Sequence, residues 1–329
     1  MGRDELAGKR ALVTGGLGFI GSNLVRSLAG LGAQVSVIDA LIPQHGGDLY
    51  NLEGLEDRVH VVVADMRDDA ALRHLTRGQD FIFHLAGQVS HGDSMRDPGL
   101  DLAVNCTATM KLVEACRAQN PSAILIYTST RQVYGRPRYL PVDEAHPIDP
   151  IDVNGINKLA AEYYHLLYHR VYDLRSTVLR LTNTYGPRQQ IKNDRQGVAG
   201  VFLHRALRGD TLRLFGTGKQ LRDFNYVDDV VDALLLAATT PSCFGRVFNL
   251  GSPDRHSLVE FVSVLRDLCG VEYEVVPFPS DRQLIDIGDY YGSFDAFREA
   301  TGWEPKTNLR DGLRLSVEFF RQHFHHYVA

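Results

Sequence analysis

The sequence has little of what marks secreted, membrane or nucleic-acid-binding proteins. Its four cysteines lie far apart without a CxxC pair, which argues against a disulfide framework or a zinc site and indicates reduced thiols. No run of about 18 apolar residues occurs, so no spanning helix is predicted. The charged start, MGRDELAGKR, does not resemble a signal peptide. The 35 basic and 40 acidic residues are interspersed, which excludes a nucleic-acid surface. We expect a cytoplasmic protein with a small-molecule partner and no membrane contact.

The chain does contain a regular alternation of short Val- and Ile-rich runs with longer amphipathic segments. This alternation is typical of βαβ units around a parallel sheet. We predict helices over 23–31, 70–76 and 102–119, and strands over 11–14, 34–39, 59–64, 81–85 and 124–129. Because crossovers between parallel strands are right-handed, the helices cover both faces. The predicted fold class is α/β, with a doubly wound parallel sheet of the Rossmann type.

A glycine-rich segment, TGGLGFIGS at 14–22, directly follows the first predicted strand. The spacing of Gly15, Gly18 and Gly21 allows a tight turn that brings backbone N–H groups to a pyrophosphate at a helix start. Asp39 ends the second predicted strand, about twenty residues further on, where a carboxylate accepts hydrogen bonds from the adenosine ribose. A carboxylate there also repels a 2′-phosphate, so the pattern predicts NAD rather than NADP. Arg58 and Arg67 could reverse this preference, but neither directly follows Asp39.

After about residue 180, glycine and proline interrupt shorter predicted elements. We therefore predict an NAD-binding Rossmann domain at 1–180 and a smaller α/β substrate domain at 181–329. Some strands and helices of the second half are expected to return to the first domain.

Further motifs run along nearly the whole chain: HLAGQ at 84–88, STRQVYG at 129–135, NTYGP at 183–187 and GKQLRDFNYVDD at 218–229. With the glycine-rich turn, they make the chain resemble the extended short-chain dehydrogenase/reductase family, in its branch of nucleotide-sugar epimerases and dehydratases. The resemblance implies an enzyme, an isomerase or a lyase, with NAD as cofactor. It also implies a nucleotide-diphosphate sugar linked to UDP or dTDP, and a homodimer formed through residues 102–119 and 158–172.

The resemblance further implies which residues meet the two ligands. Besides the three glycines and Asp39, those implied for NAD are Phe19, Ile20, Asp65, Met66, Leu85, Ala86, Gln88, Asn105 and Lys158. Those implied for the nucleotide sugar are Asn183 and Arg222 at the phosphates, Val198 and Ala199 at the nucleotide, Phe215 at the base, and Arg282 as a second phosphate ligand.

Members of this family use a tyrosine as general base, a lysine four residues later, and a Ser or Thr that positions the sugar hydroxyl. Thr130 and Lys158 stand at two of these positions, but Asn154 stands where the tyrosine belongs. An amide cannot take a proton at any useful pH. Three explanations stay open: an inactive Asn154 mutant, a protein that binds NAD and sugar without turnover, and replacement by another group. His91 and Tyr134 are the candidates for that group, although His91 could equally be an exposed loop residue and the resemblance implies a structural role for Tyr134.

Arg131 and Gln132 follow Thr130, where dehydratases of this branch carry Asp-Glu and decarboxylases tend to carry Glu at the second place. This disfavours water elimination. The leading expectation is epimerisation through a transient 4-keto sugar, and the alternatives are decarboxylation, reduction or silent NAD binding. Arg131 either meets an anionic sugar such as a uronate or is a surface loop arginine.

Overall fold

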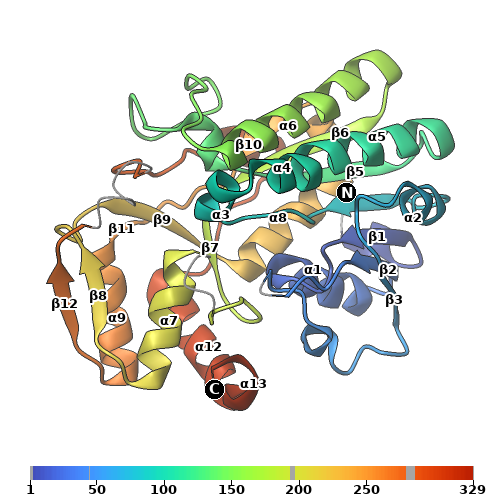
Figure 1. Cartoon of the computed structure of the whole chain (residues 1–329). Helices are drawn as coiled ribbons and strands as arrows, with labels where there is room; N and C mark the ends of the chain where they lie inside the picture. Colours follow the sequence, from blue (N-terminus) through green and yellow to red (C-terminus); the bar gives the residue numbers. More distant parts are fainter. Residues whose placement is uncertain (1–2, 44, 193–196, 279–285, 329) are drawn as a thin grey trace.

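The computed structural model of the protein describes residues 3–43, 45–192, 197–278 and 286–328. Its centre is a seven-stranded sheet in the order β10-β6-β5-β4-β1-β2-β3, in which all neighbouring strands are parallel (Figure 1). The strands are β1 (Arg10–Thr14), β2 (Gln34–Asp39), β3 (Val59–Val63), β4 (Phe81–His84), β5 (Ile124–Thr130), β6 (Arg175–Leu181) and β10 (Val247–Asn249). This order is that of a doubly wound dinucleotide-binding sheet, so the predicted fold class is confirmed.

The strands are apolar on both sides because both faces of the sheet are covered. On β1 and β2, Leu12 and Ile38 belong to the hydrophobic core of one face, whereas Val13 and Val37 belong to the core of the other. All four side chains are fully buried. This accounts for the Val- and Ile-rich runs that predicted the strands.

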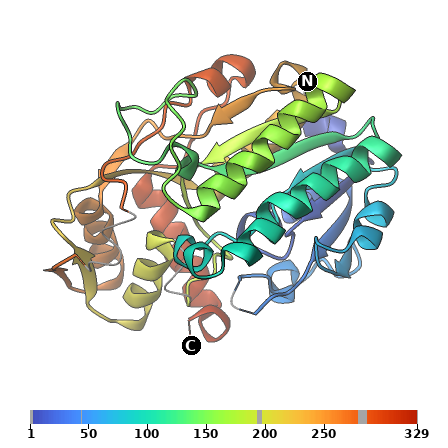
Figure 2. The same ribbon diagram turned by 45° about the horizontal axis from the view of Figure 1, so that its top comes forward.

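Helices form a layer on each face. One layer consists of α2 (Asp69–Leu75), α5 (Ala108–Gln119) and α6 (Val153–Tyr172), and α5 and α6 run side by side in Figure 2. The other contains α1 (Phe19–Gly30) and α8 (Val227–Thr239), which pack against each other. Within the described ranges, none of the helices has the length and apolar character needed to cross a bilayer.

One predicted helix differs from expectation. Residues 102–119 form a π-helical segment, η3 (Leu102–Thr107), followed by α5. Two short helices precede it, α3 (His91–Arg96) and α4 (Pro98–Asp101). A π-helical turn is wider than an α-helical one and is frequent at functional sites. Here it carries the buried Asn105, which is described with the site below.

The second half of the chain builds two smaller sheets with their own core. One has the order β11-β9-β7 and the other pairs β12 with β8. Their strands are β7 (Asn183–Tyr185), β8 (Leu212–Phe215), β9 (Leu221–Tyr226), β11 (Arg255–Ser257) and β12 (Tyr273–Val276). The helices are α7 (Val198–Arg208), α9 (Leu258–Cys269), α12 (Leu309–Gln322) and α13 (Phe324–Tyr327).

Other parts of the second half pack on the large sheet. Strand β10 pairs with β6, and α8 and α11 (Asp295–Thr301) contribute side chains to the large-sheet core. The remaining short elements are η1 (Arg3–Leu6), η2 (Leu49–Leu52), η4 (Arg131–Tyr134) and η5 (Pro241–Cys243). The predicted domain boundary near residue 180 stays a prediction.

Candidate active site

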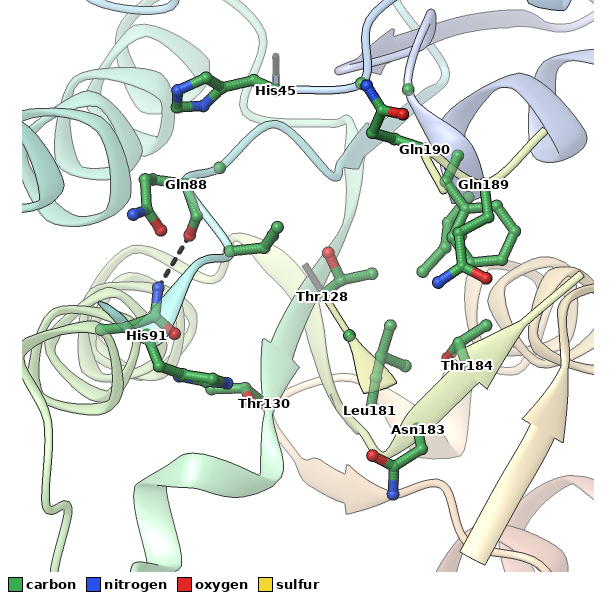
Figure 3. Close-up of a pocket in the computed structure, with 18 of the residues that line it drawn as sticks. His45, Gln88, His91, Thr128, Thr130, Leu181, Asn183, Thr184, Gln189 and Gln190 are labelled. Atoms are coloured by element: carbon green, nitrogen blue, oxygen red, sulfur yellow. Dashed lines mark hydrogen bonds between the residues drawn. The ribbon is translucent and has the colours of Figure 1, made fainter. Parts of the chain in front are cut away.

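A cavity of about 690 Å³ lies at the carboxyl ends of β1, β4 and β5, facing residues of the second half of the chain (Figure 3). Strand order reverses between β1 and β4, which is where open α/β sheets bind ligands. The predicted site residues that line this cavity are Gly15, Gly18, Phe19, Ile20, Gly21, Asp39, Asp65, Met66, Leu85, Ala86, Gln88, His91, Thr130, Asn154, Lys158, Asn183, Val198, Ala199, Phe215 and Arg222.

Two predicted residues stand apart from this set. Asn105 is buried and does not line the cavity. Its amide donates to the Gln88 carbonyl (3.0 Å) and accepts from the Gln88 N–H (3.1 Å). It therefore holds the backbone that follows β4 instead of facing the cavity. Arg282 lies outside the described residues.

The glycine turn has the shape of a phosphate cradle. Gly15 has φ +68°, and a Cβ there would lie 2.8 Å from the Ala86 backbone, so only glycine fits. Gly18 is the N-cap of α1, which places the N–H groups of the first turn of α1 at the cavity. A helix N-terminus of this kind attracts an anion through its free N–H groups and its dipole. These residues fit the pyrophosphate of a dinucleotide.

Asp39 is fixed at the same end of the cavity. Its carboxylate accepts hydrogen bonds from the backbone N–H groups of Leu17 (3.1 Å) and Leu41 (3.0 Å). Burial raises the pKa of Asp39, and these two hydrogen bonds oppose that rise. The carboxylate is held in place with acceptor capacity to spare, as a ribose diol requires.

The two arginines that could have reversed the NAD preference are engaged elsewhere. Arg67 forms a two-bond ion pair with Asp65 (2.7 and 3.0 Å), which lowers the pKa of Asp65. Arg58 donates to the carbonyl of Ala29. Neither arginine lines the cavity. The charge at the ribose end is therefore that of Asp39.

Asn154, where the family resemblance implies a tyrosine, is only 2% exposed. Its side-chain N–H donates to the carbonyl of Gln88 at 2.8 Å. The same amide lies 3.3 Å from the carboxylate of Asp101, which also accepts from Asn105 and Asn157. This buried amide–carboxylate network ties α6 to the loop after β4. It gives Asn154 a positioning role and no proton to exchange.

Lys158 lies one turn further along α6 and is 6% exposed. Its ammonium donates to the carbonyl of Thr128 (3.1 Å) and lies 5.0 Å from the centre of the Tyr127 ring. Burial lowers the pKa of Lys158 to about 8, although the charges of Asp101 and Glu162 oppose this shift. A Cβ at Gly87 would lie 3.0 Å from the ammonium, so a glycine there keeps Lys158 accessible from the cavity.

His91 and Asp152 form a pair at the cavity wall. Nδ1 of His91 lies 3.0 Å from Oδ2 of Asp152, whose side chain is fully buried. The same carboxylate accepts from the side chain of Gln132 (3.0 Å) and, through Oδ1, from the N–H of Gly155 (2.7 Å) as the N-cap of α6. Burial alone would raise the pKa of Asp152, but these hydrogen bonds, led by that of His91, hold it below its ordinary value.

This arrangement has a chemical consequence. A carboxylate that accepts from Nδ1–H fixes the imidazole orientation and leaves Nε2 as the acceptor. His91 is about a third exposed and lines the cavity together with Thr130 (Figure 3). It can therefore take and return a proton there.

Tyr134, the other candidate proton carrier, is buried away from the cavity. Its hydroxyl donates to Asn249 (2.7 Å) and accepts from Arg180 (2.6 Å). Burial raises the pKa of Tyr134 to about 12, and the Arg180 charge only partly offsets the rise. Tyr134 is therefore a structural residue.

The opposite end of the cavity carries the predicted substrate residues. Arg222 on β9 is mostly buried; burial, followed by the charge of Arg131, lowers its pKa to about 10. It lies 3.6 Å from Asp286. The amide of Asn183 donates to the carbonyl of Asp223 (3.1 Å). Nη1 of Arg222 also donates to the carbonyls of Leu221 and Gly288. Because no carboxylate of the described residues lies closer to this guanidinium than Asp286, it is suited to a diphosphate.

Three residues of the site, two of them buried behind the cavity wall, were not found by reasoning from the sequence. Asp152 carried only the signal of a helix N-cap, and the His91 contact joins residues 61 positions apart. Asp101 had no signal beyond an acidic residue before a helix. Phe278 faces Phe215 with ring centroids 5.8 Å apart and lines the cavity, which adds a second aromatic wall suited to a nucleotide base.

Comparison with known proteins places these observations in context. The sequence model of the family described as "NAD dependent epimerase/dehydratase family" matches residues 11–251. The UDP-glucose 4-epimerase of Mycolicibacterium smegmatis is 35% identical over 313 residues, covering 95% of this chain and 98% of that protein. The Thermotoga maritima UDP-glucose 4-epimerase, in its crystal structure with UDP-glucose, is 33% identical, with a TM-score of 0.87. The match covers 96% of this chain and 99% of that one.

A third similar protein is the Thermus thermophilus UDP-glucose 4-epimerase, whose structure is a complex with NAD. It is 31% identical, with a TM-score of 0.83, and the match covers 95% of this chain and 99% of that one. The similarity to all three proteins extends over nearly the full length of each.

Proposed function

Because this chain belongs to the NAD-dependent epimerase/dehydratase family, we propose that it interconverts two epimers of a nucleotide-diphosphate sugar through a transient keto sugar. The observation that carries the proposal is the single cavity that joins the glycine turn and Asp39 at one end to Asn183 and Arg222 at the other. Thr130, Lys158 and His91 line the same cavity. A sugar bound in this cavity could therefore be oxidised by a dinucleotide bound in the same cavity.

NAD supplies reversible hydride acceptance when it is bound. In the proposed assignment, the glycine turn and the N-terminus of α1 bind its pyrophosphate, and Asp39 binds the adenosine ribose. Lys158 is assigned to the nicotinamide ribose. Met66, Leu85 and Ala86 supply apolar walls of the cavity.

The proton step is assigned to His91. Thr130 positions the sugar hydroxyl, and Nε2 of His91 takes its proton as the carbon is oxidised to a ketone. Asp152 holds the imidazole and stabilises the imidazolium that forms. His91 returns the same proton when the ketone is reduced on its other face, so the sugar changes configuration without changing mass.

The substrate class follows from the other end of the cavity and from the relatives. Arg222 is assigned to the diphosphate, Asn183 to the sugar phosphate, and Phe215 with Phe278 to the base. Val198 and Ala199, which begin α7 and line the cavity, are assigned to the nucleotide. Three UDP-glucose 4-epimerases are similar over nearly the whole chain, so we propose UDP as the nucleotide and C4 as the epimerised carbon.

A homodimer is part of the proposal. Helix α6 presents four apolar side chains to solvent at helical spacing: Ile156 (52% exposed), Tyr163 (58%), Leu167 (42%) and Val171 (56%). This stripe is continuous along α6, which lies beside α5 (Figure 2). A second copy of the chain would bury this stripe.

The four cysteines are free thiols, which supports our assignment of the protein to the cytoplasm.

The buried network at Asn154 favours one second candidate, a protein that binds both ligands without turnover. In that case wild-type protein would form no product, and Asn154→Tyr would create activity where there was none. Appreciable wild-type turnover would exclude it.

The test is product analysis. Purified protein with NAD is incubated in turn with UDP-glucose, UDP-galactose, their N-acetylated forms and the matching uronates, and the nucleotide sugars are separated by chromatography and mass. We expect an epimer of unchanged mass from at least one of these. A product lighter by carbon dioxide or water, or none from any of them, would overturn the proposal.

A further inference from the structure

Arg131 is a cavity residue that the proposed reaction does not use. It follows Thr130 directly, as the first residue of η4, and lines the cavity. Its guanidinium carbon lies 5.0 Å from the centre of the Tyr290 ring. Its hydrogen bond is a long one of 3.4 Å, from Nη1 to the side-chain oxygen of Gln132. The side chain is therefore held in place by stacking more than by a polar partner.

Two buried arginines show what Arg131, which is only partly buried, lacks. Arg180 forms a close ion pair with Glu162 (2.6 Å), and Arg222 lies 3.6 Å from Asp286. Among the residues that the structure describes, Arg131 has no carboxylate within the 4.0 Å of an ion pair. Burial lowers the pKa of Arg131, although the charges of Tyr290 and of the more distant carboxylates Asp223, Asp152 and Asp286 oppose this shift. A partly buried guanidinium that faces the cavity and, among the described residues, makes one long hydrogen bond is suited to an anionic group of a ligand.

The position of Arg131 favours the sugar end of a bound nucleotide sugar. Arg131 is the next residue in the chain after Thr130, the residue assigned to the reacting hydroxyl. Arg222, in contrast, belongs to β9 in the second half of the chain. The two charges are close enough that Arg131 lowers the pKa of Arg222. One diphosphate can engage Arg222 while a second anionic group on the same ligand engages Arg131.

We propose that Arg131 forms a subsite for a carboxylate on the sugar, so that the preferred substrate is a nucleotide-linked uronate. This inference rests on the proposed function of the same cavity. A guanidinium binds a carboxylate through two parallel N–H···O bonds, and the Tyr290 ring keeps its plane fixed for that contact. A neutral hexose has no group to pair with the charge, so it leaves Arg131 unsatisfied.

Equilibrium binding tests the subsite without turnover. NAD-loaded protein is titrated with UDP-glucuronate and UDP-galacturonate and with the neutral UDP-glucose and UDP-galactose. We expect the wild type to bind the uronates more tightly. Arg131→Gln should weaken uronate binding at least about tenfold while changing hexose binding by no more than about threefold. Arg131→Lys keeps the positive charge but cannot form two parallel hydrogen bonds to a carboxylate. Its affinity for uronates should therefore lie between those of the wild type and Arg131→Gln.

Arg222→Gln is the matched comparison, because loss of the proposed diphosphate contact should weaken uronates and hexoses alike. If Arg131→Gln lowered the affinity for uronates and for hexoses equally, Arg131 would bind the diphosphate, and the proposed carboxylate subsite would be overturned. No change for either class would overturn it as well. These results do not depend on the product assay, so failure of the proposed epimerisation and failure of the subsite are separately visible.

Discussion

Oδ2 of Asp152 lies 3.0 Å from Nδ1 of His91, and the same carboxylate is the N-cap of the helix that carries Asn154 and Lys158. The residue that orients the proposed proton carrier is thus fixed by the start of α6. Asn154, at the position where the family resemblance implies a tyrosine, and the histidine held beside the cavity therefore belong to one local structure.

Asp152→Asn separates the two roles of this carboxylate. Asparagine is as good an N-cap as aspartate, so the melting temperature should change little. The amide no longer fixes the Nδ1–H form of His91, so kcat should fall at least about tenfold while KM is nearly unchanged. Epimer formation and thermal unfolding are measured on the same preparations. Full activity in a stably folded variant would show that Asp152 is only a cap.

Lys158 predicts a pH dependence of stability. Burial lowers its pKa from 10.5 to about 8, so between these values the unfolded chain binds more protons than the native one. The free energy of unfolding must then rise with pH over this range, by about 1.4 kcal/mol for each unit by which the pKa of Lys158 is lowered. Below about pH 8 the lysine is charged in both states, and its burial cost is fully present.

Comparison with Lys158→Met isolates this contribution. The charge of Lys158 also lowers the pKa of His84 and of His165, but burial is the larger cause in both and keeps these histidines neutral above pH 7. Urea unfolding of the NAD-free proteins is measured at about pH 7 and about pH 10. The stability advantage of the methionine variant should shrink at the higher pH. An advantage that is the same at both values would show that the buried ammonium titrates normally.

Asp39 predicts cofactor choice. The carboxylate is positioned by the N–H groups of Leu17 and Leu41, and Arg58 and Arg67 are occupied elsewhere. Asp39→Asn should weaken NAD binding about tenfold and reduce the discrimination against NADP, because the repulsion of a 2′-phosphate is removed. Fluorescence titration with both dinucleotides measures this, with the exposed Asp57→Asn as control. Unchanged discrimination would assign Asp39 to the fold alone.

The apolar stripe on α6 predicts the oligomeric state. Leu167→Arg places a charge in the middle of the proposed dimer contact and should shift the protein to monomers in analytical ultracentrifugation. Leu315→Arg, at a similarly exposed leucine of α12, should leave the dimer intact. A wild type that sediments as a monomer, or a dimer indifferent to Leu167→Arg, would contradict the assignment.

The fold and most of the cavity could be predicted because their signals are local. Strand runs, the glycine turn and Asp39 each lie within a few residues of the element they mark, and a parallel sheet brings their carboxyl ends to one edge. The structure gathers these residues around one cavity, and their individual roles stay predictions.

What could not be predicted depends on contacts between distant segments. Asp152 resembles any helix N-cap until packing places His91 against it. The sequence predicts that Asn154 replaces a general base, but its hydrogen bond to the Gln88 carbonyl depends on how α6 lies against the loop after β4. Asn105 was assigned to the cofactor, yet it supports the same loop from behind.

The most direct test of the account is the absorption band of reduced nicotinamide when a nucleotide sugar that the wild type epimerises is added to NAD-loaded protein. Wild type and the distant control His74→Gln should show the band appear as the keto sugar forms. His91→Gln should bind both ligands and show at most a hundredth of the wild-type rate. A band that appears as fast in His91→Gln as in the wild type would contradict the assignment of His91 as the proton carrier.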